Sequence, residues 1–173
     1  IAISVEVTRK MLSALPFGMT RQDARGIWQP VKLIITDSAK VNDIYVKSRL
    51  EGADVDVELV NLGDSSITVT PEMTVTSESD GSELVEVEGD SVRLSAGETK
   101  VVTLSFSDVK PKLWAPNSPE IYKFLVEIEV DDEDVDSLSV NSAFKTFETR
   151  GNRLYLNGKP YALRGANHCP NML

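Results

Sequence analysis

Hydrophobic and polar residues alternate along most of this chain. The alternation is clearest in "DVDVELVN" (residues 54–61), "SITVTPEMTVTS" (66–77) and "IYKFLVEIEV" (121–130). Side chains of a β-strand point to opposite faces in turn, so a period of two predicts strands with one buried face. The same pattern occurs in "NDIYVKSRLEG" (42–52), "ELVEVEG" (83–89), "SVRLSAG" (91–97), "KVVTLSF" (100–106) and "LSVNSAF" (138–144).

Turn-forming residues separate these segments. They occur in "EGAD", "NLGDSS", "SDGS", "EGDS", "SAGE" and "DDEDVD". About seven strands spaced by roughly 8–12 residues predict an all-β fold, an antiparallel sandwich of immunoglobulin type. The antibody-type cysteine pair is absent, so this prediction rests on strand number and patterning. We expect eight side chains to point inward: Ile44, Val57, Leu59, Val69, Leu104, Tyr122, Phe124 and Val126.

The two flanks differ from the predicted sandwich, which we place at residues 39–149. "IAISVEV" alternates from the first residue, so we expect residues 1–38 to hold the end of a preceding domain and a linker, cut from a longer chain. Residues 150–173 contain "LYLNGKPYAL", which predicts a two-residue hairpin with Asn157 and Gly158 in a type I′ turn. We expect Leu154, Leu156 and Leu163 to pack on the sandwich or on a neighbouring chain.

Charge and composition exclude several classes of function. The 173 residues have a formal net charge of −9, which argues against a nucleic-acid-binding protein because phosphate contacts need clustered Lys and Arg. No apolar run approaches the roughly 20 residues that a membrane-spanning helix needs. A single Cys excludes an internal disulfide and leaves the compartment open.

The acidic segment 131–136 is a candidate calcium loop. Carboxylates at Asp132, Asp134 and Asp136 resemble the start of an EF-hand loop. Ser137 then replaces the required glycine, and Ala143 replaces the bidentate glutamate. We therefore interpret the segment as a solvated hairpin loop.

No other cofactor or metal site is predicted. His168 and Cys169 are adjacent, so in an extended chain they point to opposite faces and make a poor nucleophile–base pair. One His and one Cys cannot form a structural zinc site without carboxylates. Trp28 and Trp114 each lie beside a proline-containing turn; a sugar-stacking role is open, but we favour packing at a strand end.

Three stretches resemble glycoside hydrolase family 2, the group of β-galactosidases, β-glucuronidases and β-mannosidases. They are "RGIWQPVKL" (25–33), "LWAPNSPEIYKFLVEI" (113–128) and "FKTFETRGNRLYLNGKPYALRGANH" (144–168). The resemblance implies the end of a jelly-roll domain in residues 1–38. It also implies an immunoglobulin-like sandwich in 39–149 and the truncated start of a catalytic (β/α)₈ barrel in 150–173.

The resemblance also implies roles for individual residues. In this family "LRG-x-N" is the first barrel strand, so Arg164, Asn167 and His168 are the expected substrate-binding residues, with His168 departing somewhat from the family pattern. Retaining glycosidases use two carboxylates about 5–5.5 Å apart. The family's pair are glutamates on later barrel strands, one within an Asn-Glu dipeptide that this chain lacks. We therefore expect the catalytic residues beyond Leu173.

Two functions follow as hypotheses. The first is an accessory sandwich of a family 2 enzyme that hydrolyses O-glycosidic bonds, with neighbouring jelly-roll and barrel domains, a carbohydrate substrate and no cofactor. The alternative is a stand-alone carbohydrate-binding or adhesion module without catalysis. The sequence does not identify the sugar. Localisation is unassigned, and a periplasmic or secreted longer protein is favoured because members of the family often have that location.

Overall fold

The computed structural model describes Val31 and residues 36–165 of the chain. The regular structure there consists of strands joined by turns and loops, and no helix is long and apolar enough to cross a membrane in that part. The strands are β1 (Ala39–Ser48), β2 (Ala53–Asn61), β3 (Ile67–Ser77), β4 (Glu83–Glu88), β5 (Val92–Leu94), β6 (Thr99–Phe106), β7 (Tyr122–Val130), β8 (Glu133–Ser142), β9 (Phe147–Arg150), β10 (Arg153–Leu156) and β11 (Lys159–Tyr161).

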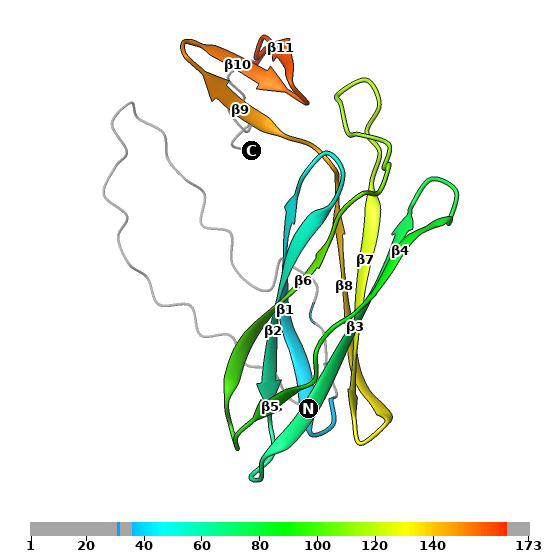
Figure 1. Ribbon diagram of the computed structural model, residues 1–173, viewed down its shortest axis with the longest axis vertical. Helices are drawn as coiled ribbons and strands as arrows, with labels where there is room; N and C mark the ends of the chain where they lie inside the picture. Colours follow the sequence, from blue (N-terminus) through cyan, green and yellow to red (C-terminus); the bar gives the residue numbers. More distant parts are fainter. Residues whose placement is uncertain (1–30, 32–35, 166–173) are drawn as a thin grey trace, which may run out of the picture. The chain divides into compact units, whose positions relative to one another are not determined.

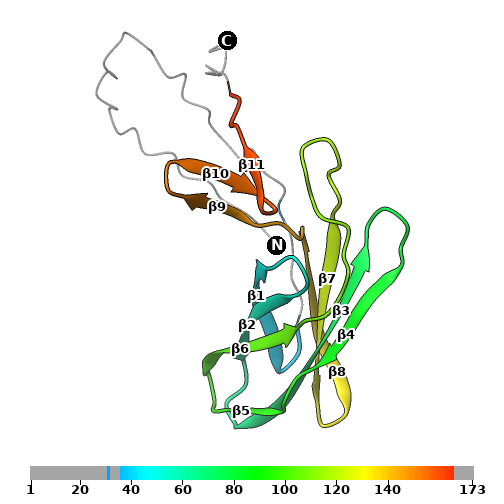
Figure 2. The ribbon, with the colours of Figure 1, turned by 45° about the horizontal axis from the view of Figure 1, so that its top comes forward.

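Strands β1–β8 form two antiparallel sheets. One sheet has the order β1-β2-β6, and the other has the order β4-β3-β7-β8 with β5 paired to the start of β3 (Figures 1 and 2). Sequence neighbours β5 and β6 therefore lie in different sheets, as in a Greek-key sandwich. This arrangement confirms the immunoglobulin-like β-sandwich that the alternation predicted.

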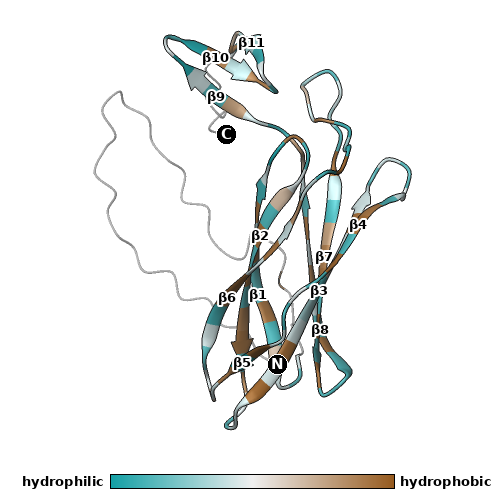
Figure 3. Cartoon of the chain, viewed as in Figure 1, coloured by the Kyte–Doolittle hydropathy of each residue, from teal (hydrophilic) through white to brown (hydrophobic). Residues whose placement is uncertain are grey.

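The core lies between the two sheets. Hydrophobic and hydrophilic residues alternate along their strands (Figure 3). All eight residues that we expected to point inward are buried. Phe144 follows β8 and closes one end of the core, where its ring meets those of Tyr122 and Phe106 edge to face. Burial of these apolar surfaces, at about 25 cal/mol per Å², is the main stabilising contribution to the sandwich.

Pro71 lies in the middle of the long strand β3, where proline is normally excluded. Its carbonyl accepts a hydrogen bond of 2.8 Å from the Gly89 N–H, on the side of β3 that faces β4 and β5. A residue of an antiparallel strand directs its N–H and C=O to the same side. The missing donor therefore falls where β3 changes partner from β5 to β4, between the pairs Val69–Val92 and Glu72–Glu88, and leaves the ladder to β7 intact.

The acidic loop is shorter than predicted. Asp131 and Asp132, both with positive φ (55° and 63°), form a two-residue turn, and β8 already begins at Glu133. Aspartate tolerates the left-handed conformation that such turns require, so two residues suffice. Asp136 lies within β8 and accepts a hydrogen bond of 2.9 Å from the Val41 N–H of β1.

A third sheet, with the order β11-β10-β9, follows the sandwich. The predicted hairpin is confirmed: Leu156 pairs with Lys159, and Asn157 and Gly158 have φ of 51° and 74°. The sequence did not predict the first strand of this sheet, Phe147–Arg150. Leu154 and Leu156 are half-buried, whereas Leu163 is 66% exposed in the single chain. Packing of Leu163 on a neighbouring chain stays a prediction.

Candidate functional site

Of the three expected substrate-binding residues, only Arg164 is described. It follows β11 in a segment without regular structure, and its side chain is exposed. Asn167 and His168 lie outside the described residues, as do Cys169 and Trp28. The substrate-binding role of Arg164, Asn167 and His168 therefore stays a prediction.

Trp114 has the structural surroundings of a packing residue. Its side chain is half-buried, its N–H donates to the Phe144 carbonyl at 2.9 Å, and its carbonyl accepts from the Asn157 side chain at 2.9 Å. The Lys145 ammonium lies 4.5 Å from the centre of the indole ring, which is cation–π geometry. Trp114 lies within the loop between β6 and β7, so the expected position at a strand end is wrong. Its contacts agree with the packing role that we favoured over sugar stacking.

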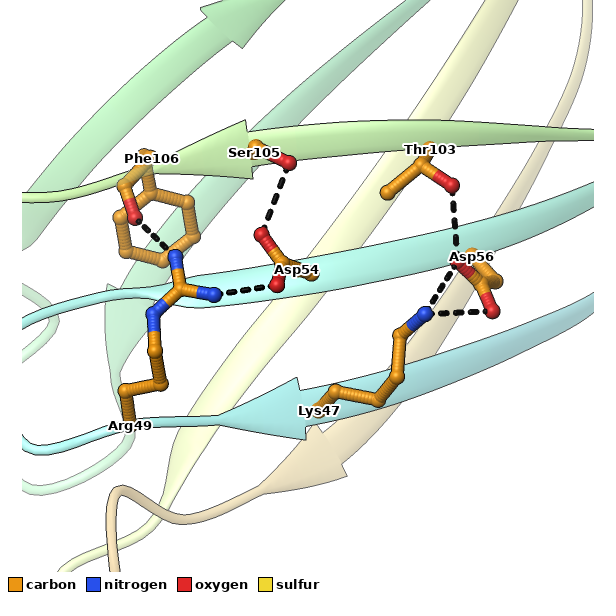
Figure 4. Close-up of polar contacts among 7 residues, drawn as sticks. All are labelled: Lys47, Arg49, Asp54, Asp56, Thr103, Ser105 and Phe106. Carbon is orange, nitrogen blue, oxygen red and sulfur yellow. Dashed lines mark hydrogen bonds and ion pairs between the residues drawn. The ribbon is translucent and has the colours of Figure 1, made fainter.

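Two rows of polar side chains cross the outer face of the β1-β2-β6 sheet (Figure 4). In the first row, Lys47 donates to both carboxylate oxygens of Asp56 at 2.8 Å, and the Thr103 hydroxyl donates to the same carboxylate at 2.8 Å. In the second row, the guanidinium of Arg49 and the hydroxyl of Ser105 both donate to Asp54.

These donors lower the pKa values of both carboxyl groups. Hydrogen bonds from Arg49 and then Ser105 lower the pKa of Asp54, and hydrogen bonds from Lys47 and then Thr103 lower that of Asp56. Both aspartates are therefore ionised at neutral pH and each has a cationic partner. A carboxylate that stays ionised at neutral pH is poorly suited to general-acid catalysis. Each row instead connects β2 with β6 and with β1 or the residue that follows it.

A second acidic group lies on the outer face of the other sheet. Glu72 of β3 is directly opposite Glu88 of β4 on one side and Glu127 of β7 on the other. A shared hydrogen bond with Glu86, then burial, then repulsion from Glu86, Glu129 and Glu127 raise the pKa of Glu72 to about 7. Sequence reasoning treated these glutamates as solvated, because their proximity depends on the pairing of strands far apart in the chain.

Neither acidic group has the geometry of a metal site. Among the described residues, no group of three or more His, Cys, Asp or Glu side chains could hold a metal ion. The raised pKa of Glu72 is explained by its hydrogen bond with Glu86, then by burial, then by repulsion from neighbouring carboxylates. Such surroundings perturb a carboxyl group on a sheet surface without any catalytic role.

The sheet order and the core define an immunoglobulin-like β-sandwich domain, and comparison with known proteins identifies its family. Residues 39–145 match the model of glycosyl hydrolases family 2, so the chain belongs to that family. A curated β-galactosidase of Streptococcus thermophilus is 28% identical over 146 residues, which are 82% of this chain and 14% of that protein. The chain thus spans about one seventh of this relative.

Solved structures give the same family. The chain matches a β-glucuronidase of Bacteroides uniformis with a TM-score of 0.61 and 25% identity, over 75% of this chain and 17% of that one. A family 2 member from Bacteroides cellulosilyticus matches with a TM-score of 0.63 at 19% identity, over 75% of this chain and 19% of that one. The second similarity shows the fold alone.

Proposed function

We propose that this chain is the accessory immunoglobulin-like sandwich of a longer family 2 glycosidase, and that catalysis belongs to a barrel outside these residues. The observation that carries the proposal is the family match over residues 39–145, which coincide with the sandwich. The relatives named above are family 2 proteins of which this chain covers only 14–19%. Their remaining length is room for a catalytic domain.

The β9–β11 sheet has a partly exposed apolar face that supports the presence of a following domain. Register places Phe147 opposite Leu156 and Leu154 opposite Tyr161, so these four side chains share one face of the sheet. Phe147 is 51% exposed and packs edge to face on Tyr161, with ring centres 6.3 Å apart. An apolar face that the described residues leave partly exposed is suited to packing against a following domain.

The proposed chemistry is hydrolysis of an O-glycosidic bond with retention of configuration. Such a reaction needs an acid/base and a nucleophile about 5–5.5 Å apart on either side of the bond. The paired aspartates and Glu72 lie on the outer faces of opposite sheets, with the core between them, so they cannot flank one glycosidic bond. The chain also lacks the Asn-Glu dipeptide of the family's acid/base. We therefore assign no catalytic residue within the described part, and assign substrate contacts to Arg164, Asn167 and His168.

A panel of aryl glycosides tests this proposal. The 173-residue chain and the longer protein are each assayed on the aryl galactoside, glucuronide, mannoside and glucoside. We expect no turnover by the 173-residue chain, and turnover of at least one substrate by the longer protein, with the retained anomer seen first by NMR. Turnover by the purified 173-residue chain contradicts the assignment of catalysis to a barrel. A longer protein inactive on the panel, with a sandwich that binds glycans in calorimetry, supports the binding-module alternative.

A further inference from the structure

The tip of the β10–β11 hairpin is held by residues outside the hairpin. The backbone N–H of Asn157 donates to the Thr146 carbonyl at 2.9 Å, and the Asn157 Oδ1 atom accepts from the Thr146 N–H at 3.0 Å. The Asn157 Nδ2 atom donates to the Trp114 carbonyl at 2.9 Å. Asn157 therefore makes three hydrogen bonds to two segments, one before β9 and one between β6 and β7.

Two of these bonds extend the ladder between β9 and β10. The last regular pair is Leu156 with Phe147, so the next would be Asn157 with Thr146. In a regular antiparallel pair, the Thr146 N–H would bond to the backbone carbonyl of residue 157. Asn157 has turned into the left-handed conformation with φ of 51°, and its side-chain oxygen accepts that hydrogen bond instead.

Both segments that Asn157 contacts are fixed to the sandwich. Phe144, two residues before Thr146, is fully buried in the core. The Phe144 carbonyl accepts the N–H of Trp114, so the two segments are also joined to each other. Two residues before Trp114, the Lys112 N–H donates to the hydroxyl of buried Tyr122 at 2.8 Å.

We propose that Asn157 is a positioning residue that holds the β9–β11 sheet and the sandwich as one rigid body. A two-residue turn needs only positive φ at its tip, which Gly-Gly supplies as well as Asn-Gly. The turn therefore does not require the side chain of Asn157. That side chain instead connects the β9–β11 sheet to the sandwich, a connection called the joint below. One consequence rests on the proposed function: if a barrel follows the sandwich, the joint sets the direction in which the chain enters that barrel.

The test uses three variants of the 173-residue chain. Asn157→Gly keeps the turn conformation and removes both side-chain hydrogen bonds. Asn157→Asp keeps an oxygen that accepts from Thr146 and loses the donor to Trp114. Asn152→Gly is the matched control, because Asn152 lies in the β9–β10 turn of the same sheet and its side chain makes no hydrogen bond to any described residue.

Two NMR measurements distinguish a loss of the fixed orientation between β9–β11 and the sandwich from unfolding of the hairpin. Residual dipolar couplings of the wild type and of Asn152→Gly are expected to fit one alignment tensor for β1–β11. In Asn157→Gly, β9–β11 are expected to need a second, smaller tensor, while the cross-strand NOEs of the hairpin persist. The Thr146 amide is expected to exchange roughly five- to tenfold faster in Asn157→Gly and at the wild-type rate in Asn157→Asp.

A single tensor for Asn157→Gly overturns the proposal, and so does Thr146 exchange that is equally fast in Asn157→Asp and Asn157→Gly. Neither measurement needs a substrate. A longer protein without glycosidase activity therefore overturns the proposed function without touching this result.

Discussion

Glu72 lies among carboxylates on the outer face of the β4-β3-β7-β8 sheet. Its hydrogen bond with Glu86, its partial burial and repulsion from Glu86, Glu129 and Glu127 all disfavour its ionised form. Its pKa is raised to about 7 from an ordinary value of 4.5. The folded state therefore binds this proton more tightly than the unfolded state. The contribution of protonated Glu72 to the free energy of unfolding is fully present below pH 4.5 and is lost as pH rises toward 7.

We predict that Glu72→Gln removes this pH dependence. The free energy of unfolding at pH 8 should rise by about 0.5–1 kcal/mol, because the substitution removes like charges directly opposite one another. Urea unfolding from pH 4 to pH 8 measures the change, and the slope between pH 5 and 7 should flatten. Glu83→Gln, at a position opposite Thr76, is the control and should leave that slope as it is. An unchanged slope in Glu72→Gln contradicts the assignment.

Gly52 is required by close packing at the start of β2. A Cβ atom there would overlap the backbone carbonyl of Phe106 and lie 2.9 Å from the Ser107 Cα. These are backbone atoms, which cannot rotate away as a side chain can.

We predict that Gly52→Ala destabilises the chain by about 2–3 kcal/mol, the cost of overpacking against a rigid neighbour. Thermal unfolding measures it. Gly63→Ala is the comparison, because its Cβ would meet only the Asn61 Oδ1 at 3.3 Å and should cost less than about 1 kcal/mol. Equal losses in the two variants would show that the overlap at Phe106 is relieved.

At the scale of the elements, Asn61 connects three segments at one end of the sandwich. It is the last residue of β2 and is 1% exposed. Its Nδ2 atom donates to the Ser65 carbonyl at 2.8 Å and to the Ser95 carbonyl at 2.9 Å, while its Oδ1 accepts from the Gly63 N–H at 2.9 Å. Its side chain thus ties the loop after β2 to the turn after β5.

We predict that Asn61→Asp lowers the free energy of unfolding by about 2–4 kcal/mol. The substitution replaces a buried donor with an oxygen that faces two carbonyl oxygens, and it buries a charge. The urea midpoint of the 173-residue chain measures the effect. Asn117→Asp, at an exposed position between β6 and β7, is the control and should stay within about 0.5 kcal/mol of wild type. A similar midpoint for both variants would mean that the connection at Asn61 is dispensable.

The elements were predictable where the sequence of a single segment is enough to determine its structure. Alternation alone assigned inward positions such as Val57 and Phe124, and Asn-Gly alone assigned the hairpin tip. Features that depend on which strands pair were not predictable. Glu72 and Glu127 are 55 positions apart and meet only through the register of β3 and β7. The side-chain roles of Asn61 and Asn157 likewise depend on partners from distant loops.

At the scale of the whole molecule, the sandwich accounts for the fold and family of this chain, while the proposed substrate contacts follow β11. The resemblance that implied them is local to "LRGANH", a segment in which hydrophobic and polar residues do not alternate. Alternation therefore predicts nothing about the role of this segment. Arg164 is the residue of the three that the structure describes, and its exposed guanidinium is free of the packing that would make its loss destabilising. Arg164 therefore offers the clearest separation of function from stability.

We predict that Arg164→Ala in the longer protein lowers kcat/KM on its best aryl glycoside by about 10- to 100-fold. That range corresponds to one or two charge-assisted hydrogen bonds to the sugar or to a carboxylate beside it. The melting temperature should stay within about 2 °C, as expected for an exposed substitution. Arg153→Ala is the matched control, because it removes the same charge from an exposed position on β10 and should leave kcat/KM unchanged. If Arg164→Ala and Arg153→Ala are equally active, Arg164 makes no contact with the substrate, and the role taken from the family motif does not hold for this protein.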